Sequence, residues 1–499
     1  MIKTYHCVIQ TCSPIHIGCD EVYEPFGFRV DDHSLELVIF SPYDFIATLE
    51  KRSLAQFSEI CMKGSISSMI EIYKFLSRTQ MDGRRIQISP AFAKHYNEVL
   101  NLPLEKEKNI QQNLNRFVID RTAYLPHDSR AYIPGSAIKG AMRTAYLNAR
   151  AKRKKLKRYR AKEAKKLERA LLDGGAFSTD PFRCIKISDF KPVGEVKTRI
   201  VYAVNEKKRP SKFKARGPYQ ILEIIEPGSR FIGTITIETP QPTAGIVAPI
   251  TFASLVESIQ MFYSGVKEKE EKELENSGIE TVLRSQKDGE RLIRLGRHSG
   301  AESVTIEGNR SIKIMTRRGE KPKWGKEATT FWLASEESKP KLKKGLKPFG
   351  WATLKLTSPQ LLEELEKEEG LWQLENKKSE FIRLEKIAKE KKELLERARK
   401  QARIRAEEER KKREEEERKA YLESLSPEER DIEMIKDPNV SEQQVVEIYR
   451  KIDEFSEANR KRLAEALKDY WIRHNKWKGK LSHKQKQKVA RIKEILEGE

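Results

Sequence analysis

The stretch Ala131-Tyr-Ile-Pro-Gly-Ser-Ala-Ile-Lys-Gly-Ala-Met-Arg143 joins an extended apolar segment to a helix. Pro134-Gly135 predicts a turn, and Ser136 is a favourable N-cap for the helix that follows. Ser136, Lys139 and Arg143 are spaced i, i+3, i+7, so they share one helix face. Free backbone amides, a hydroxyl and two cations at a helix N-terminus are the groups that bind a phosphate. An ordinary helix start with a solvated cationic face explains the same residues, so the stretch alone leaves both interpretations open.

Three further segments bear on this choice. We expect the helix to continue into the basic run Lys152-Arg-Lys-Lys-Leu-Lys-Arg-Tyr-Arg160. Such a run is usually a solvated face, which stays the preferred interpretation here, although its continuity with the proposed anion site strengthens the case for nucleic-acid binding. Lys207 to Gly217 is a basic segment that either contacts a nucleic-acid backbone or forms an exposed disordered loop. The loop Gly296-Arg-His-Ser-Gly300 has flanking glycines that would let a phosphate backbone approach closely.

Charge and composition narrow the class of protein. The 499 residues include 98 Lys and Arg against 75 Asp and Glu, a formal charge of +23, which favours a polyanionic partner. The sequence contains no run of about 18 apolar residues, which a membrane span would require. Its first residues resemble a strand rather than a signal peptide. We therefore expect a cytoplasmic protein. The five cysteines lack any C-x-x-C spacing, so we expect no metal and no cofactor.

The periodicity of apolar residues predicts an α+β fold built from small split-βαβ units. Strands are expected at residues 3–11, 36–40, 185–190, 197–204, 219–225, 230–238, 291–295 and 347–356. Helices are expected at residues 44–50, 54–79, 90–100, 109–119 and 250–276. These elements predict two β-containing parts, residues 1–175 with helical insertions and residues 176–357.

The composition changes sharply near Ser358. Residues 361–420 are nearly all Glu, Lys, Arg, Leu and Ala, which predicts a long helix supported by i,i+4 charge pairs. We therefore expect a long charged helix over residues 358–425 and a separate helical module over residues 426–499, which ends in the basic stretch Lys476–Lys488. The tail has the composition of a spacer or interaction element.

The chain offers little chemistry for catalysis. Its eight histidines form no H-x-x-x-H pattern, and no phosphate-binding P-loop or nucleophile elbow occurs. His16 follows the first expected strand, where it would act as a general acid–base in RNA cleavage or be hydrogen-bonded within a loop. We expect binding without catalysis.

Four motifs occur in a particular order along the chain. They are Ser13-Pro-Ile-His-Ile-Gly18, Tyr132-Ile-Pro-Gly-Ser-Ala-Ile-Lys-Gly140, Arg294-Leu-Gly-Arg-His-Ser-Gly300 and Pro348-Phe-Gly-Trp351. Together they resemble the RAMP superfamily of CRISPR-associated proteins, and within it the fifth-subunit family of the type III-A Csm effector complex. The resemblance covers about residues 1–356 and leaves the helical tail outside.

The resemblance implies an RRM-like (ferredoxin-like) fold in one or two copies that binds CRISPR RNA. A subunit of this kind sits at the 3′ end of the guide, caps the filament of repeated backbone subunits and supports guide maturation. Its neighbours would be the backbone subunit and the small subunits, and it would meet target RNA only indirectly. The RNA-binding residues that the resemblance implies are Gly135, Ser136, Lys139, Arg143, His16, Gly296, Arg297, His298, Ser299 and Gly300.

Two departures from the family pattern stand out. The family's late loop is usually richer in glycine and aromatic residues than the segment around Arg297-His298. The sister backbone subunit cuts target RNA with a loop aspartate, and Asp20 lies in a different context from that residue.

Two other functions remain open. One is a metal-independent endoribonuclease that matures the guide, with His16 or His298 as the general acid–base. The other is a scaffold whose function resides in residues 358–499.

Overall fold

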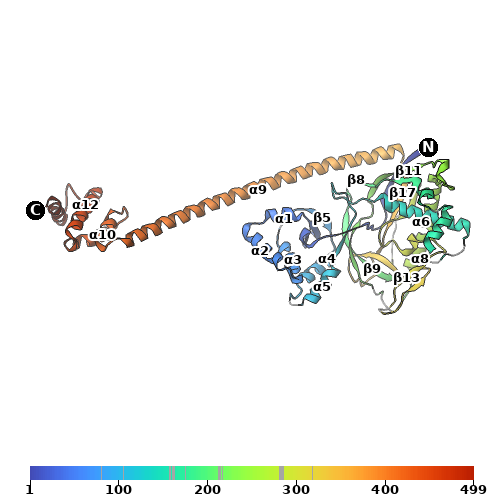
Figure 1. The fold of residues 1–499 in the computed structure, drawn as a ribbon, viewed down its shortest axis with the longest axis horizontal. Coiled ribbons are helices and arrows are strands. Elements are labelled where there is room, and N and C mark those ends of the chain that lie inside the picture. Colours follow the sequence, from blue (N-terminus) through green and yellow to red (C-terminus); the bar gives the residue numbers. More distant parts are fainter. Residues whose placement is uncertain are drawn as a thin grey trace. The chain divides into compact units, whose positions relative to one another are not determined.

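The computed structural model describes residues 1–79, 81–104, 106–156, 159, 163–174, 176–211, 215, 217–279, 286–316 and 319–498. It consists of two compact units, Met1–Lys378 and Ser379–Glu499. The first unit contains two large β-sheets with their helices, and the second is helical (Figure 1).

The first sheet is organised around β1 (Ile2–Thr11). This strand pairs antiparallel with β11 (Arg230–Glu238) on one side and with β17 (Trp351–Leu356) on the other. The strand order is β12-β17-β1-β11-β7, with β8 also paired to β11. The outer strands of this sheet are β12 (Glu290–Arg294), β7 (Ile185–Ile187) and β8 (Lys191–Val193). Alternation along β1 turns Cys7 and Ile9 to one face and Val8 to the other.

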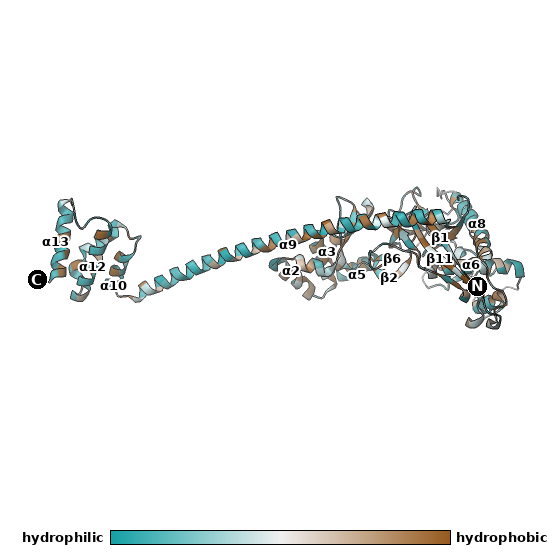
Figure 2. Ribbon diagram, turned by 90° about the horizontal axis from the view of Figure 1, so that it is seen from above, coloured by the Kyte–Doolittle hydropathy of each residue, from teal (hydrophilic) through white to brown (hydrophobic). Residues whose placement is uncertain are grey.

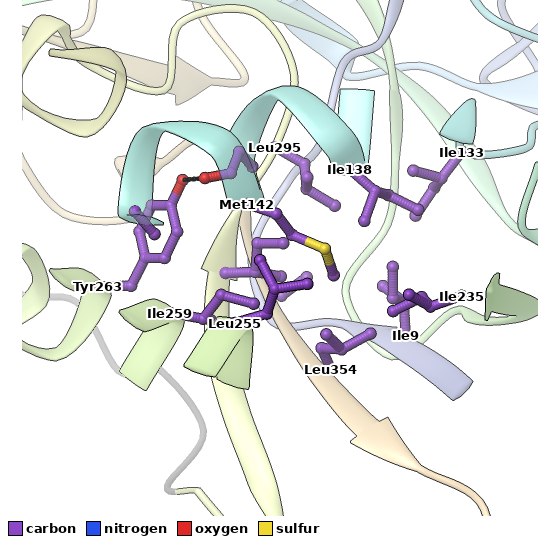
Figure 3. Close-up of a cluster of buried hydrophobic side chains, with 14 of the residues drawn as sticks. Ile9, Ile133, Ile138, Met142, Ile235, Leu255, Ile259, Tyr263, Leu295 and Leu354 are labelled. Atoms are coloured by element: carbon purple, nitrogen blue, oxygen red, sulfur yellow. Dashed lines mark hydrogen bonds between the residues drawn. The ribbon is translucent and has the colours of Figure 1, made fainter. Parts of the chain in front are cut away.

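Helices α6 (Gly135–Lys154) and α8 (Phe252–Asn276) cover the Ile9 face. Ile138 and Met142 of α6 and Leu255 and Ile259 of α8 belong to one buried cluster, in which Figure 3 shows Met142 beside Leu255. These pairs are spaced i, i+4, so each helix turns one apolar stripe to the core. The hydroxyl of Tyr263 on α8 donates a hydrogen bond of 3.2 Å to the carbonyl oxygen of Ala141, which satisfies a buried polar group between the helices.

The second sheet has the order β2-β6-β10-β9-β5-β4-β3, and β15 also pairs with β9 and with β16. Its strands are β2 (Gly18–Val22), β3 (Phe28–Asp31), β4 (Glu36–Ile39), β5 (Arg84–Gln87), β6 (Ile119–Thr122), β9 (Thr198–Lys207), β10 (Gln220–Ile225), β15 (Thr330–Ser335) and β16 (Lys347–Pro348). An aromatic core lies against this sheet, and it includes Phe28, Tyr73, Phe92, Tyr96, Phe117 and Tyr202. Helix α3 (Ile66–Ser77) brings Tyr73, helix α4 (Pro90–Leu100) brings Phe92 and Tyr96, and Phe117 directly follows α5 (Glu107–Arg116).

Smaller elements complete the first unit. They are α1 (Pro42–Thr48), α2 (Lys51–Met62), α7 (Ala164–Leu172), and the hairpin of β13 (Ile312–Ile314) and β14 (Lys323–Gly325). Helix α9 (Pro359–Ser424) starts on this unit, where Leu361 and Leu365 pack against Val8 and Val193. The first turns of α9 therefore cover part of the second face of the first sheet.

The first turns of α9 are also tied to the body by charge. Arg130 forms two hydrogen bonds with the carboxylate of Glu369, of 2.6 and 2.9 Å, and its guanidinium lies 3.7 Å from the centre of the Trp372 ring. The amide of Gly194 donates to the same carboxylate at 2.9 Å. A bidentate pair at a partly buried site fixes geometry as well as adding energy, so this contact orients the helix as it leaves the sheet.

The second unit ends in four helices around a core of its own. They are α10 (Pro427–Lys436), α11 (Glu442–Arg450), α12 (Glu457–Arg473) and α13 (His483–Glu497). The buried residues include Ile435, Ile448, Leu467 and Trp471. Figure 2 shows the C-terminal half of α9, which precedes these helices, as a largely hydrophilic helix.

The α+β class, the long helix after Ser358 and the helical C-terminus are confirmed. Three expectations need correction. Helix α6 begins at Gly135 with Pro134 in the N-cap position, so Ser136 is not the cap. It ends at Lys154, with Lys155 in a left-handed conformation, rather than continuing through the basic run. Both sheets take strands from either side of residue 175, so the expected division there does not separate them.

Some expectations lie wholly or partly outside the described residues. They concern residues 157, 158 and 160 of the first basic run and residues 212–214 and 216 of the second. Among the described residues, no helix has both the length and the apolar character that crossing a bilayer requires.

Candidate nucleic-acid interface

Three of the four sequence motifs meet at one place, which we call the loop junction: residues 13–17 after β1, residues 295–300 after β12, and residues 349–351 at the start of β17. The amide of Arg297 donates to the carbonyl oxygen of His16 at 2.8 Å, and the amide of Gly350 donates to that of Pro14 at 2.9 Å. The amide of Leu295 donates in turn to the carbonyl oxygen of Gly350 at 2.8 Å. Backbone bonds thus link all three segments, although they are distant in sequence.

Two glycines make this close approach possible. Gly296 has a φ of +81°, and a Cβ atom there would lie 2.3 Å from the carbonyl oxygen of His16. Gly350 has a φ of +93°, and its Cβ would lie 2.6 Å from the carbonyl oxygen of Leu295. Any other residue would combine an unfavourable φ with a backbone clash, so the loop junction requires glycine at both positions.

His16 is fully buried beneath the loop junction. Its Nδ1 lies 2.7 Å from the carbonyl oxygen of Glu223, which assigns the proton to Nδ1 and leaves Nε2 as the unprotonated nitrogen. Nε2 has no hydrogen-bond partner among the described residues. Burial lowers the pKa of His16, so the ring is neutral at physiological pH.

The residue that supports His16 was not identified from the sequence. Glu223 is fully buried on β10 and accepts hydrogen bonds from Arg84 at 2.5 Å, from the Tyr23 hydroxyl at 2.7 Å and from the Thr122 amide at 3.2 Å. A buried carboxylate is stable only when it is paired and hydrogen-bonded in this way. The available signal was an acidic residue inside the apolar strand Gln220–Ile225.

His298 and Arg297 are neighbours in the same loop but have different partners. The Nε2 of His298 lies 2.9 Å from Oε1 of Gln220, and its ring packs 4.4 Å from the Trp332 ring. Burial, aided by the neighbouring charge of Arg297, lowers the pKa of His298 to about 3. Arg297 pairs with Asp120 at 2.7 Å, yet 47% of its side chain remains exposed. Arg297 is therefore the cation of this loop that a ligand reaches directly.

The other two loop residues have structural partners. Ser299 is buried and its hydroxyl donates to the carbonyl oxygen of Leu295 at 2.9 Å, which closes the turn. Gly300 has a φ of +80° and precedes a short helical turn. Beside this loop lies a cavity of about 470 Å³ lined in part by Gly296, His298, Trp332, Lys208 and Lys313.

The start of α6 shares a hydrophobic core with the loop junction, since Ile138 and Leu295 belong to one buried cluster, but its polar groups already have partners. The amide of Gly135 donates to Oδ1 of Asp189 at 2.8 Å, so a carboxylate occupies the helix N-terminus. Nζ of Lys139 donates to the carbonyl oxygen of Ile185 at 2.7 Å. Ser136 is exposed and makes no capping bond. The proposed anion site is thus occupied by groups of the protein itself.

Arg143, one turn further along α6, is held by two carboxylates. It pairs with Glu168 of α7 and with Asp180, each at 2.9 Å, and lies 5.0 Å from the centre of the Phe182 ring. These contacts join α6 to the following segment. The geometry gives Arg143 a structural role in the free protein, and RNA binding by this residue stays a prediction.

A basic segment next to the loop junction was also missed. Residues 339–347 contain five lysines in nine positions, at 339, 341, 343, 344 and 347, and lead directly into Gly350. Lys343 donates to the carbonyl oxygen of Ser277 at 2.7 Å, which anchors the middle of the segment. The density of lysine was the signal for it.

The chain is similar to several proteins of known family or structure. The sequence profile of the RAMP superfamily matches residues 8–473. One similar structure is a chain of a Csm–crRNA–target RNA ternary complex of a type III-A CRISPR–Cas system, with 18% identity and a TM-score of 0.44 over 71% of this chain and 100% of that chain. Another is the crystal structure of T. onnurineus Csm5, with 18% identity and a TM-score of 0.41 over 69% of this chain and 99% of that chain. No curated protein sequence matches significantly. Because the family profile spans most of the sequence, the chain belongs to the RAMP superfamily.

Proposed function

We propose that this chain is a non-catalytic CRISPR-RNA-binding subunit of a type III-A Csm complex. In this role it caps the filament of backbone subunits at the 3′ end of the guide and supports guide maturation in antiviral defence. Its partners are the CRISPR RNA, the backbone subunit and the small subunits. The observation that carries the proposal is the loop junction, where three of the four motifs that resemble the family meet beside the exposed guanidinium of Arg297.

We also infer that the first sheet forms the ferredoxin-like unit of this family. The order β17-β1-β11-β7, with α6 connecting β1 to β7 and α8 following β11, is the order of a split-βαβ unit. β12 adds one strand outside β17.

This unit points to RNA binding through loops rather than through the open sheet face. In RRM domains, aromatic side chains on the sheet stack on bases. Here the second face of β1 presents Thr4, His6, Val8 and Gln10, and α9 packs on Val8. Loops and cationic side chains contact the phosphates and sugars of RNA rather than its bases. We therefore expect an affinity for RNA that depends little on base sequence.

The two histidines support binding without cleavage. A general acid–base must come within about 3 Å of the proton that it transfers. His16 is fully buried, and His298 is held between Gln220 and Trp332 with a pKa of about 3. In the endoribonuclease alternative, the ring that acts as general acid–base, His16 or His298, would have to leave its position. A His16→Ala, His298→Ala double variant that still matures the guide would remove that alternative.

The first experiment is purification of the tagged chain from its native host, followed by sequencing of the bound RNA and identification of the accompanying proteins. We expect a short RNA of uniform 5′ end, carrying a repeat-derived tag, together with Csm subunits. Recovery of the protein without RNA and without these subunits would contradict the proposal.

A matched pair of variants tests the role of Arg297. Arg297 pairs with Asp120 at 2.7 Å with 47% of its side chain exposed, and Arg85 pairs with Glu36 at 2.7 Å with 48% exposed. We expect Arg297→Ala to weaken RNA binding about 3- to 10-fold and to reduce the salt dependence by about 0.7, the contribution of one phosphate contact on a single strand. Arg85→Ala removes the same charge from β5, outside the loop junction, and should leave both values unchanged. Equal effects of the two variants would show that only net charge matters.

A further inference from the structure

The C-terminal module, residues 426–498, separates its charges along the sequence. Residues 428–469 contain twelve acidic and eight basic side chains, whereas residues 473–493 contain nine basic side chains and no acidic one. We call residues 473–493 the basic segment; it comprises the end of α12, the connection to α13, and most of α13 (Figure 2). A concentration of one sign on one part of a small domain creates a local positive potential.

The backbone of the basic segment is fixed by the module's core. Trp477 is only 8% exposed and stacks 6.4 Å from Trp471. The amide of Lys476 donates to the carbonyl oxygen of Trp471 at 2.7 Å, and the side chain of Gln485 donates to the carbonyl oxygen of Lys476 at 3.2 Å. Ser482 caps α13 by accepting a hydrogen bond from the amide of Gln485. The lysines between these anchors therefore project from an ordered backbone, which reduces the entropy lost on binding.

Several cations of the segment are used within the module. Lys476 pairs with Glu442, Arg491 pairs with Asp453, and Lys488 lies 5.3 Å from the centre of the Tyr449 ring. Four others are different. The exposed lysines Lys478, Lys480, Lys484 and Lys486 have no ion pair with any residue that the structure describes. Lys493, further along α13, is likewise exposed without an ion pair among the described residues, so the four lysines are the uncompensated charges of the segment from Lys478 to Lys486.

The surroundings of the four lysines favour a nucleic acid over a protein. Protein interfaces depend on buried aromatic or apolar anchors. Within residues 473–493 no large apolar side chain is exposed, because Trp477, Val489 and Ile492 all turn into the core; the exposed Ile472 precedes the segment as a single apolar side chain. The segment offers point charges on long, flexible stems, which is how lysine contacts phosphates.

We propose that the basic segment binds the phosphodiester backbone of a nucleic acid through Lys478, Lys480, Lys484 and Lys486. This contact is separate from the loop junction and depends only on residues of the second unit. It gives the chain a second nucleic-acid site outside the sheets.

The test uses the full chain and two variants with equal loss of charge. In the first, Lys478, Lys480, Lys484 and Lys486 are replaced by Gln. In the control, four other cations of the same module are replaced by Gln: Arg450, Lys451, Lys461 and Lys468. Their side chains also have no ion pair among the described residues. Circular dichroism checks that both variants keep their helical content.

Binding is measured by fluorescence anisotropy with an oligouridylate of about 40 nucleotides and with oligothymidylate of equal length, over a range of salt concentrations. We expect the basic-segment variant to lose about tenfold or more in affinity, with the salt slope reduced by about 3 for four phosphate contacts. The control should change less than about twofold. Equal loss with RNA and DNA identifies the shared backbone as the ligand, whereas loss with RNA alone identifies RNA.

Two results would overturn the proposal. The first is an equal loss of affinity in both variants, which would assign the effect to net charge. The second is displacement of the bound oligonucleotide from the basic segment by polyglutamate of equal charge, which would assign the site to an acidic protein. Neither result touches the proposed function, because Arg297→Ala reports on the loop junction independently.

Discussion

The backbone amide of Arg297 donates a 2.8 Å hydrogen bond to the carbonyl oxygen of His16, which ties the loop after β12 to the loop after β1. The bond forms because Gly296 brings one backbone against the other.

This closeness predicts a large cost for a small substitution. Gly296→Ala places a methyl group 2.3 Å from the carbonyl oxygen of His16, so it must displace one of the two loops. We expect it to lower the free energy of unfolding by about 3 kcal/mol, through clash and unfavourable φ together. The control is Gly228→Ala, which has a φ of +96° and nothing within 4 Å of the new methyl group. Gly228→Ala should lower the free energy of unfolding by only about 1–2 kcal/mol. Urea unfolding of both variants measures the difference, and equal costs would mean that the loops yield freely.

His298 predicts how stability depends on pH. Its pKa falls from an ordinary value near 6.5 to about 3 on folding, because the ring is buried. The unfolded chain therefore takes up a proton that the folded chain does not, and stability decreases as pH falls from about 6.5 towards 3. His298 contributes a slope of up to about 1.4 kcal/mol per pH unit in this window.

The variant His298→Asn isolates this effect, because Asn tolerates the positive φ of 63° at this position and does not titrate. The variant should show a shallower decline of the urea midpoint below pH 6.5. His16, whose pKa is also lowered by burial, continues to contribute. An unchanged profile would show that His298 is already protonated in the folded protein.

Arg143 predicts a coupling between α6 and the residues after it. Its pairs with Glu168 and Asp180 are partly exposed, so we expect a double-mutant cycle between Arg143 and Asp180 to give about 1 kcal/mol. If α6 also binds RNA, Arg143→Gln should weaken binding beyond the loss seen in Asp180→Asn, which disturbs the same structure while keeping the cation. Equal RNA affinities of these two variants would leave Arg143 a structural role alone.

The first turns of α9 predict where the tail can be removed. Truncation after Lys378 keeps Leu361, Leu365 and Glu369 on the first unit, whereas truncation after Thr357 exposes Val8 and leaves Arg130 without Glu369. Removal of Glu369 leaves Arg130 paired with Asp128, and removal of Leu361 and Leu365 uncovers Val8 and Val193, so the lost burial and the weakened ion pair together cost about 3 kcal/mol. We expect the shorter protein to have a lower melting temperature by roughly 5 °C or more. Identical melting temperatures would show that the helix does not stabilise the sheet.

Much of the fold was predictable where the local pattern was strong. β1 and β11 are long and rich in β-branched residues, and the uniform composition of residues 359–424 predicts one helix. β2, with the sequence Gly-Cys-Asp-Glu-Val, and β6, with Ile-Asp-Arg-Thr, carry no such pattern. They are strands because their neighbours in the second sheet supply hydrogen bonds.

In the candidate site, too, the sequence predicted the features that have a local pattern and missed those that depend on tertiary packing. The sequence motifs located the segments of the loop junction, because glycine and proline mark tight turns at any distance from their partners. No local pattern could show that Asp189 occupies the N-terminus of α6 or that Asp180 neutralises Arg143, since these partners are brought in by packing. A cationic motif therefore needs its tertiary neighbours before its free charge can be judged.

The position of β1 at the centre of the first sheet has a consequence for synthesis on the ribosome. The strand is synthesised before both of its partners, because β11 and β17 lie more than 200 residues later in the chain. Pairing over such separations is slow, because a long loop must close before any contact forms. The nascent chain therefore carries β1 without a partner strand at least until residues 230–238 have been made, and chaperones that shield exposed strands should govern how much protein reaches the native fold.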